Sequence, residues 1–87
     1  MAELKSRPVT IAVTDTLLSP KKSRNGFLII ENTDAANPVE ITFGEQAAVV
    51  NEGHNLIAGA RLVVSDPGEG EIRAIATGGN VVVTITD

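Results

Sequence analysis

The chain has 87 residues, a formal net charge of −4 and no cysteine, tryptophan or tyrosine. This composition excludes disulfides and thiolate metal sites, and a single histidine, His54, excludes a multi-histidine zinc site. A domain this short buries only about 60–65% of its extended surface, so oligomerisation is the remaining usual source of extra stability.

No apolar run approaches the roughly 18 residues that a membrane span needs, and the N-terminus has no apolar signal-peptide region. We therefore expect a protein made in a cytoplasm that stays there or leaves as part of something larger. The charge is uneven, since residues 1–24 carry five cationic and two acidic side chains while residues 25–87 carry two and nine. Such a basic segment indicates either an arm that docks on an acidic partner or a segment that is simply solvated.

Taken in chain order, the sequence alternates short apolar strands with turns. Residues 8–14 alternate strictly, and Pro8 suits the first residue of a strand or an edge strand. Residues 17–26 have the Pro and Asn-Gly signals of a loop. The next two strands, 27–32 and 39–43, are separated by a short turn, which predicts an antiparallel hairpin.

The second half of the chain continues the pattern after one ambiguous region. Residues 46–60 could hold short strands at 48–50 and 55–57, or a helical turn at 46–50. Further strands are predicted at 61–65, 71–77 and 80–86, the last two as a hairpin around Gly78-Gly79. Six or seven strands without a convincing helix predict an all-β fold: a single antiparallel β-sandwich or barrel over residues 8–87, preceded by a short arm of residues 1–7.

One strand is apolar on both sides. Phe27 and Ile29 point to one face and Leu28 and Ile30 to the other. Either loops of this domain cover the second face, or a neighbouring copy or another protein does. Because exposed apolar patches usually mark contact surfaces, we expect residues 27–30 to form an oligomer or partner interface.

Motifs for chemistry are few. His54 lies between turn residues without an identifiable catalytic partner, so we expect no enzymatic activity. Asp66, Glu69 and Glu71 cluster on a glycine-rich turn but lack the spacing of a calcium loop, which favours a solvated turn and leaves cation binding open. There is no nucleotide-binding glycine motif, and the acidic body without base-stacking aromatics disfavours nucleic acid. We expect no cofactor, metal or small-molecule substrate.

Six segments together resemble a small β-domain family found among the virion proteins of tailed phages. They are PVTIAVT, RNGFLIIEN, NPVEITFG, LIAGARLVV, GEIRAIATGG and NVVVTIT, which cover nearly everything after residue 7. The chain departs from the family pattern at Ala58, where proline is frequent, and at Glu71 or Arg73, where an aromatic is frequent.

The resemblance implies a non-enzymatic virion component, located on the capsid surface and made in the cytoplasm of a bacterial host. The first expectation is a decoration (cement) protein that forms a homo-oligomer, most simply a trimer, and binds the major capsid protein. In that role Leu4, Lys5 and Arg7 of the arm would contact the capsid. The alternatives are a head-fibre or tail-associated adaptor and, in another class, a surface- or carbohydrate-binding module, which the absence of Trp and Tyr disfavours.

Overall fold

The computed structural model describes residues 6–24, 28–44, 46–50, 52–65 and 68–87. Every regular element in these residues is a strand, so the all-β class is confirmed, with eight strands instead of six or seven. The strands are β1 (Ser6–Ile11), β2 (Thr16–Ser19), β3 (Leu28–Asn32), β4 (Val39–Phe43), β5 (His54–Leu56), β6 (Arg61–Val64), β7 (Ile72–Ala76) and β8 (Val81–Thr86). Consequently no helix in the described residues could cross a membrane.

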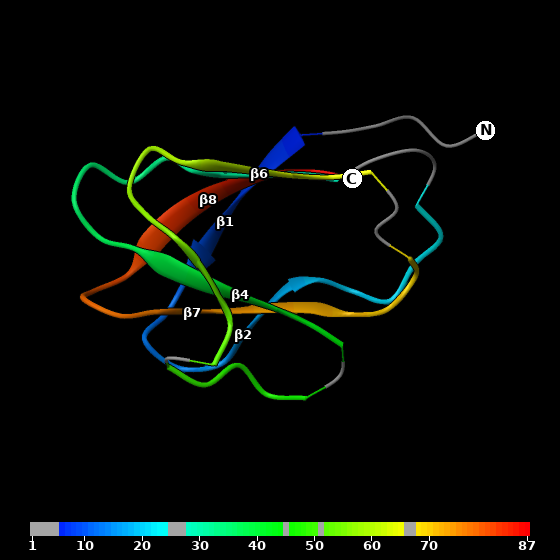
Figure 1. Ribbon diagram of the computed structural model, residues 1–87, viewed down its shortest axis with the longest axis horizontal. Helices are drawn as coiled ribbons and strands as arrows, with labels where there is room; N and C mark the ends of the chain where they lie inside the picture. Colours follow the sequence, from blue (N-terminus) through cyan, green and yellow to red (C-terminus); the bar gives the residue numbers. More distant parts are fainter. Residues whose placement is uncertain (1–5, 25–27, 45, 51, 66–67) are drawn as a thin grey trace.

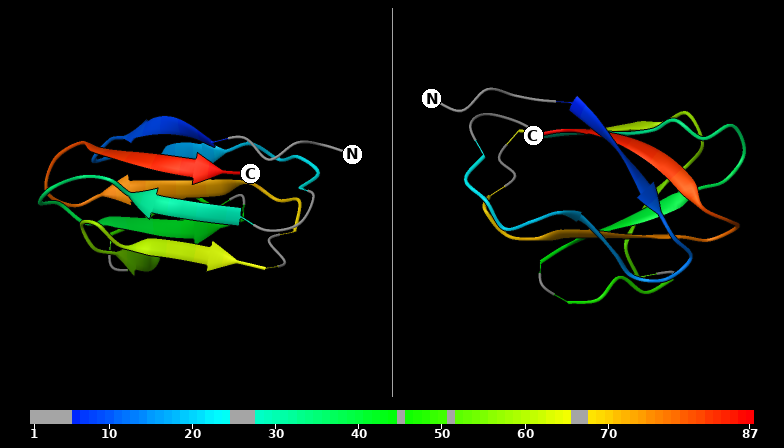
Figure 2. Two further views of the ribbon diagram at one scale, coloured as in Figure 1. Left: turned by 90° about the horizontal axis from the view of Figure 1, so that it is seen from above. Right: turned by 180° about the vertical axis from the view of Figure 1, so that it is seen from behind.

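The strands form two four-stranded antiparallel sheets (Figures 1 and 2). Sheet A has the order β1-β8-β3-β6 and sheet B the order β2-β7-β4-β5. The alternation in β8 shows how the sequence builds this arrangement, because Val81, Val83 and Ile85 are fully buried while the residues between them are not. Both sheets contribute to one core cluster of Val, Ile, Leu and Ala side chains.

Both predicted hairpins are wrong. Strand β3 pairs with β6 and β8, while β4 pairs with β5 and β7, so the turn at 33–38 connects the two sheets. The turn between β7 and β8 does the same, since these strands also lie in different sheets. A short turn can connect two neighbouring strands of one sheet, or it can connect a strand of one sheet to a strand of the other. The apolar residues of the strands have the same period of two in both cases, so the sequence does not distinguish them.

Asn32 shows what supports the first of these turns. Its side chain is fully buried at the end of β3, in phase with Leu28 and Ile30. The Asn32 Nδ2 donates hydrogen bonds to the carbonyl oxygens of Asn37 and Leu56, both at 3.0 Å, and its Oδ1 accepts one from the Asp34 amide at 2.9 Å. One amide therefore joins sheet A, the connecting turn and β5 of sheet B.

Two segments differ from expectation. Residues 17–26 were predicted to be a loop, but Thr16–Ser19 forms β2, an edge strand whose register with β7 shifts between Leu17 and Ser19. That irregularity breaks the period of two by which strands are recognised. Residues 46–50 form neither the strand nor the helical turn, and only Ala48 among them is buried. Pro8 lies in the edge strand β1, as its missing amide predicts.

Gly53, in the turn before β5, lies against part of the outer face of sheet B. Glu40 and Ile75 alternate with core residues and so point outward, yet both are buried. The Gly53 amide donates a hydrogen bond to Glu40 Oε1 at 3.3 Å, and a Cβ added at Gly53 would lie 2.8 Å from the carbonyl oxygen of Ile41. This outer face is therefore partly covered by the chain itself.

Gly53→Ala is expected to destabilise the fold by about 1–3 kcal/mol, because the new methyl group meets backbone of β4 that cannot move aside without disturbing the sheet. Urea unfolding followed by circular dichroism measures the change. Gly70→Ala is the matched control, since a Cβ there has nothing within 4 Å, and its effect should be small. Equal stabilities for the two variants would contradict the close approach of Gly53 to β4.

Candidate functional sites: the outer face of sheet A and the Asp87 cluster

The outer face of sheet A is formed by the residues that alternate with the core residues of its four strands. These are Ser6, Pro8, Thr10, Ile29, Glu31, Arg61, Val63, Val82, Thr84 and Thr86. Strand pairing aligns them in rows across the sheet, and none is fully buried. Val63 is 57% exposed and Val82 is 43% exposed, so this face presents branched aliphatic and threonine side chains to solvent.

The charges on this face cancel. Among the described residues, its two ionisable members are Glu31 and Arg61, which face each other across β3 and β6 with Arg61 Nη2 at 3.5 Å from Glu31 Oε1. Both side chains are well exposed, so the pair contributes little to stability. Ser6 Oγ and Thr86 Oγ1 form a hydrogen bond of 2.6 Å across β1 and β8. The face is therefore neutral on a chain whose net charge is −4.

Of the interface predicted over residues 27–30, the structure buries two residues in the core and leaves one on the outer face of sheet A. Leu28 and Ile30 are fully buried in the core, so they cannot contact a partner. Ile29 points to the outer face, where it is paired with Val63 of β6 and Thr86 of β8. Phe27 lies outside the described residues. Among the described residues, the second apolar side of this strand is thus represented by Ile29, within a larger neutral face.

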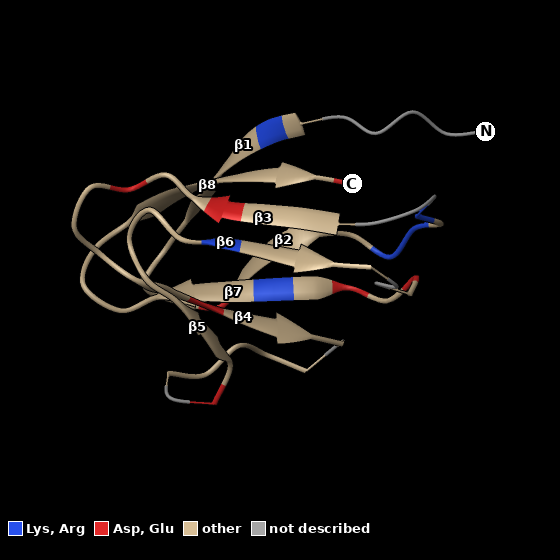
Figure 3. Cartoon of the chain, turned by 45° about the horizontal axis from the view of Figure 1, so that its top comes forward, with Lys and Arg blue, Asp and Glu red and all other residues tan. Residues whose placement is uncertain are grey.

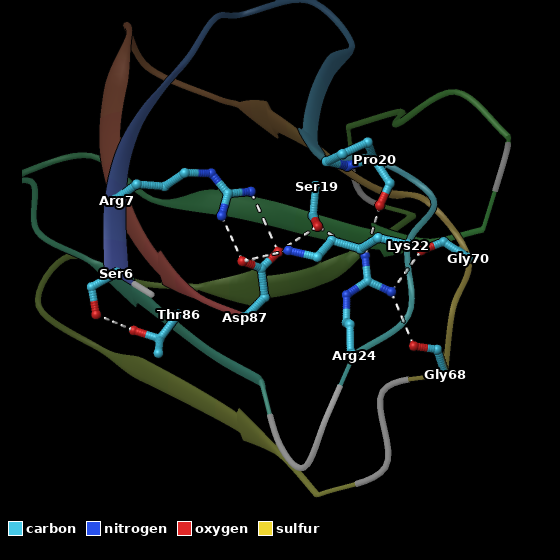
Figure 4. A network of polar contacts seen from close by, with 10 residues as sticks. All are labelled: Ser6, Arg7, Ser19, Pro20, Lys22, Arg24, Gly68, Gly70, Thr86 and Asp87. Carbon is cyan, nitrogen blue, oxygen red and sulfur yellow. Dashed lines mark hydrogen bonds and ion pairs between the residues drawn. The ribbon is translucent and has the colours of Figure 1, made fainter. Parts of the chain in front are cut away.

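The second site is the Asp87 cluster, in which residues from both ends of the described chain meet (Figure 4). The Asp87 side chain is only 1% exposed. Its carboxylate accepts hydrogen bonds from Arg7 Nη1 at 2.5 Å and Nη2 at 3.3 Å, and from Ser19 Oγ at 2.7 Å. Lys22 Nζ lies 3.4 Å from its Oδ1. One carboxylate therefore joins β1, the end of β2, the following loop and the end of β8.

Arg24 extends the cluster to the loop that connects β6 with β7. Its Nη2 donates to Ser19 Oγ at 2.8 Å and to the Pro20 carbonyl oxygen at 3.1 Å. Its Nη1 donates to the carbonyl oxygens of Gly68 and Gly70 at 3.0 and 2.9 Å. Ser19 thus accepts from Arg24 and donates to Asp87, which couples the guanidinium to the carboxylate.

The environment decides how the charges of this cluster behave. Burial by itself raises the pKa of the Asp87 carboxyl, but the hydrogen bonds from Arg7 and Ser19 and the charges of Arg7 and Lys22 lower it to about 2. Burial lowers the pKa of Arg24; Asp87 acts to raise it and the like charge of Arg7 lowers it further. Asp87 therefore stays ionised at every pH near neutrality.

The structure places Arg7 differently from the sequence prediction. Ser6 and Arg7 were assigned to the arm, but both belong to β1, and Arg7 is paired with Ile85 and bound to Asp87. Leu4 and Lys5 lie outside the described residues. Arg7 therefore has a place in the folded domain, and any contact it makes with a partner must be made from β1.

The Asp87 cluster was missed in the sequence, although one signal could have revealed it. Asp87 continues the series Val81, Val83 and Ile85, all of which face the core. Arg7 is in phase with Val9 and Ile11 in the same way. Arg7 at the start of β1 and Asp87 directly after β8 are thus opposite charges on the core side of their strands. Charged residues at core-facing positions are usually paired, so this pattern predicts a buried carboxylate with a cationic partner.

The remaining candidate residues do not form a catalytic or metal-binding arrangement in the described part of the chain. His54 is exposed, and its ring meets Phe43 edge to face with centroids 5.9 Å apart. Glu71 is bound to Arg73, which also contacts Asp15, and Asp66 lies outside the described residues. No group of three or more potential metal ligands occurs among the described residues.

Comparison with known proteins adds no relative. No protein-family model matches this chain, and no curated protein matches it. Its function must therefore be argued from the sequence and these two sites.

Proposed function

We propose that this chain is a non-enzymatic virion structural protein, most simply a decoration protein that binds the outer surface of a phage capsid as a homotrimer. The resemblance of its turns and strands to a phage virion β-domain supports this proposal, and it implies that the two sheets form a β-sandwich. The observation that carries the proposal is the outer face of sheet A, which nothing in the described residues covers, whereas the outer face of sheet B is partly covered by the chain itself.

A second copy of the chain is the occupant that this face suits best. Two net-negative molecules repel each other, but a face that holds one Glu31 and one Arg61 adds no repulsion of its own. Burying the exposed side chains of Val63 and Val82 between two copies lowers the free energy, because apolar surface leaves water. A short domain without disulfides also benefits from association, because binding of the folded state raises its apparent stability.

The mechanism of decoration is physical. An oligomer that contacts several capsid subunits at once stabilises their assembled arrangement, because separating them also breaks its contacts. At an effective ligand concentration of 100 times the dissociation constant, such linkage contributes about 2.7 kcal/mol. Multivalent attachment through identical copies strengthens the binding without requiring any strong single contact.

The test is attachment to purified capsids together with the mass of the free protein. We expect sedimentation equilibrium to show a trimer, and capsid sedimentation to carry the protein down in a stoichiometry comparable with the major capsid protein. A small copy number confined to one vertex would indicate the head-fibre or tail-associated alternative instead. A stable monomer that does not bind capsids would overturn the proposal.

Val63→Lys identifies the surface responsible. A charge placed on β6, the edge strand of sheet A whose Val63 is exposed on the outer face, should dissociate the oligomer, because an unpaired ammonium group would have to be buried on association. Val13→Lys is the matched control, since Val13 is similarly exposed but lies in the turn after β1. The molar mass of that variant, measured by sedimentation equilibrium, should remain that of the wild-type oligomer.

A further inference from the structure

Strand β6 ends sheet A on the side opposite β1 (Figure 2). It pairs with β3 in a regular register from Arg61 to Val64, and no strand in the described residues pairs with its other edge. A strand edge without a partner presents a row of amide and carbonyl groups that can bind a further strand. The free edge of β6 is therefore a contact surface distinct from the outer face of sheet A.

The hydrogen bonds around β3 show which backbone groups of β6 point to this free edge. The Asn32 amide donates to the Ala60 carbonyl oxygen at 2.9 Å, and this pair continues the register of β3 and β6. Hydrogen-bonded and non-hydrogen-bonded pairs alternate along antiparallel strands, so Leu62 also bonds to β3. The amide and carbonyl groups of Arg61 and Val63, which alternate with it, therefore point away from β3.

Each of the other three edge strands has a feature that hinders the addition of a strand. The Thr33 amide donates to the Val82 carbonyl oxygen, and the alternation from there directs the backbone of Pro8 and Thr10 in β1 to the free edge. Proline removes a donor at that place. Strand β2 has its register shift, and β5 is only three residues long. Among these four described edges, β6 alone has a regular register of four residues and no proline.

We infer that the free edge of β6 binds β6 of a second copy, antiparallel and about a two-fold axis, so that sheet A continues from one copy into the other. An axis perpendicular to the sheet keeps every side chain on its own face, so residues that lie opposite each other share the same phase. In the register centred on Val63, the two Val63 residues exchange their outward amide and carbonyl groups. Leu62 then lies opposite Val64 of the second copy, and Arg61 lies opposite Ser65.

The side chains of β6 are complementary to those of a second β6. Arg61 is the one charged residue of the strand (Figure 3), and this register places the two Arg61 side chains at opposite ends of the pair. Leu62 and Val64 are only partly buried against the core, and each acquires an apolar neighbour in the second copy. On the outer face the two Val63 side chains, each 57% exposed, meet each other. The contact goes beyond the proposed function, because it joins copies edge to edge and needs no capsid.

A single introduced cysteine tests the pairing, because the chain has none of its own. Opposite residues of a hydrogen-bonded antiparallel pair have Cα atoms about 5.5 Å apart, which a disulfide can span. Val63→Cys should therefore form a disulfide-linked dimer under mild oxidation, measured by non-reducing gel electrophoresis. Val82→Cys is the matched control, since Val82 is also exposed on the outer face but lies on β8, two strands from this edge. It should cross-link far more slowly.

The role of the backbone is tested in the Val63→Cys background. Arg61→Pro removes an outward amide at the first residue of the strand, where proline is tolerated, and Arg61→Ala removes the same charge but keeps the amide. Arg61→Pro should lower the initial cross-linking rate about tenfold relative to Arg61→Ala, because the axis removes a hydrogen bond at both ends of the pair. Circular dichroism should show both variants folded. If Arg61→Pro does not fold, the comparison of Val63→Cys with Val82→Cys decides alone.

Equal cross-linking of Val63→Cys and Val82→Cys, or equal rates for folded Arg61→Pro and Arg61→Ala, would overturn the inference. A Val63→Cys chain that forms no covalent dimer would also overturn it and leave the edge to a strand of another protein. A trimer that decorates capsids without this cross-link would keep the proposed function and refute the edge contact. A protein that cross-links as predicted but never binds capsids would do the opposite.

Discussion

Asp87→Asn is expected to lower the free energy of unfolding by about 2 kcal/mol at pH 7. The folded-state pKa of Asp87 is about 2, against an ordinary value of 3.8. A depression of that size corresponds to roughly 2 kcal/mol of stabilisation in the ionised form. Asparagine also leaves Arg7 and Lys22 without their counter-ion, but both can be hydrated, which keeps the loss below the 3–5 kcal/mol typical of a fully buried pair.

The pH dependence gives this prediction a second measurement. Because folding lowers the pKa of Asp87, its contribution is fully present above about pH 4 and disappears as the pH falls through about 2. Urea unfolding should therefore separate wild type and Asp87→Asn at pH 7 and bring them together near pH 2. Glu31→Gln provides the control, since its exposed pair with Arg61 is worth at most about 1 kcal/mol. A difference between wild type and Asp87→Asn that persists undiminished at pH 2 would show that the charge of Asp87 is not its cause.

The strands could be predicted where one face of each is apolar over five or six residues. Thus β4 and β8 were found almost to the residue, because an apolar core-facing residue recurs at every second position of each. Strand β2 could not be found this way, because it is only four residues long and its pairing with β7 contains a register shift. The sequence also could not predict which strands pair, because β3 and β4 would show the same alternation whether they lay in one sheet or in two.

The candidate sites depend on contacts between residues that are far apart in the sequence. Arg7 and Asp87 are separated by 80 positions, and Ser19 and Asp87 by 68, so neither contact has a local motif. The apolar residues 27–30 led to the prediction of a contact surface there, but a run of apolar residues does not say which side chains turn inward. The phase of a strand decides that, and it is fixed only when its neighbours are known.

Ile30→Ala is expected to destabilise the protein by about 2–5 kcal/mol, whereas Ile29→Ala should change its folding stability by less than about 1 kcal/mol. The two isoleucines are adjacent in β3, but Ile30 is fully buried and Ile29 lies on the outer face of sheet A. The first substitution leaves a cavity between the sheets, and its effect is a large fraction of the roughly 4–13 kcal/mol available to a domain of this size. Urea unfolding of the two variants at a concentration where both are monomeric measures the difference. Ile29→Ala should act instead on association, shifting the sedimentation equilibrium toward the monomer as Val63→Lys does, because the two side chains are neighbours across β3 and β6. If Ile29→Ala costs as much folding stability as Ile30→Ala in the monomer, then the second face of β3 is covered within the domain and the outer face of sheet A is not an interface between copies.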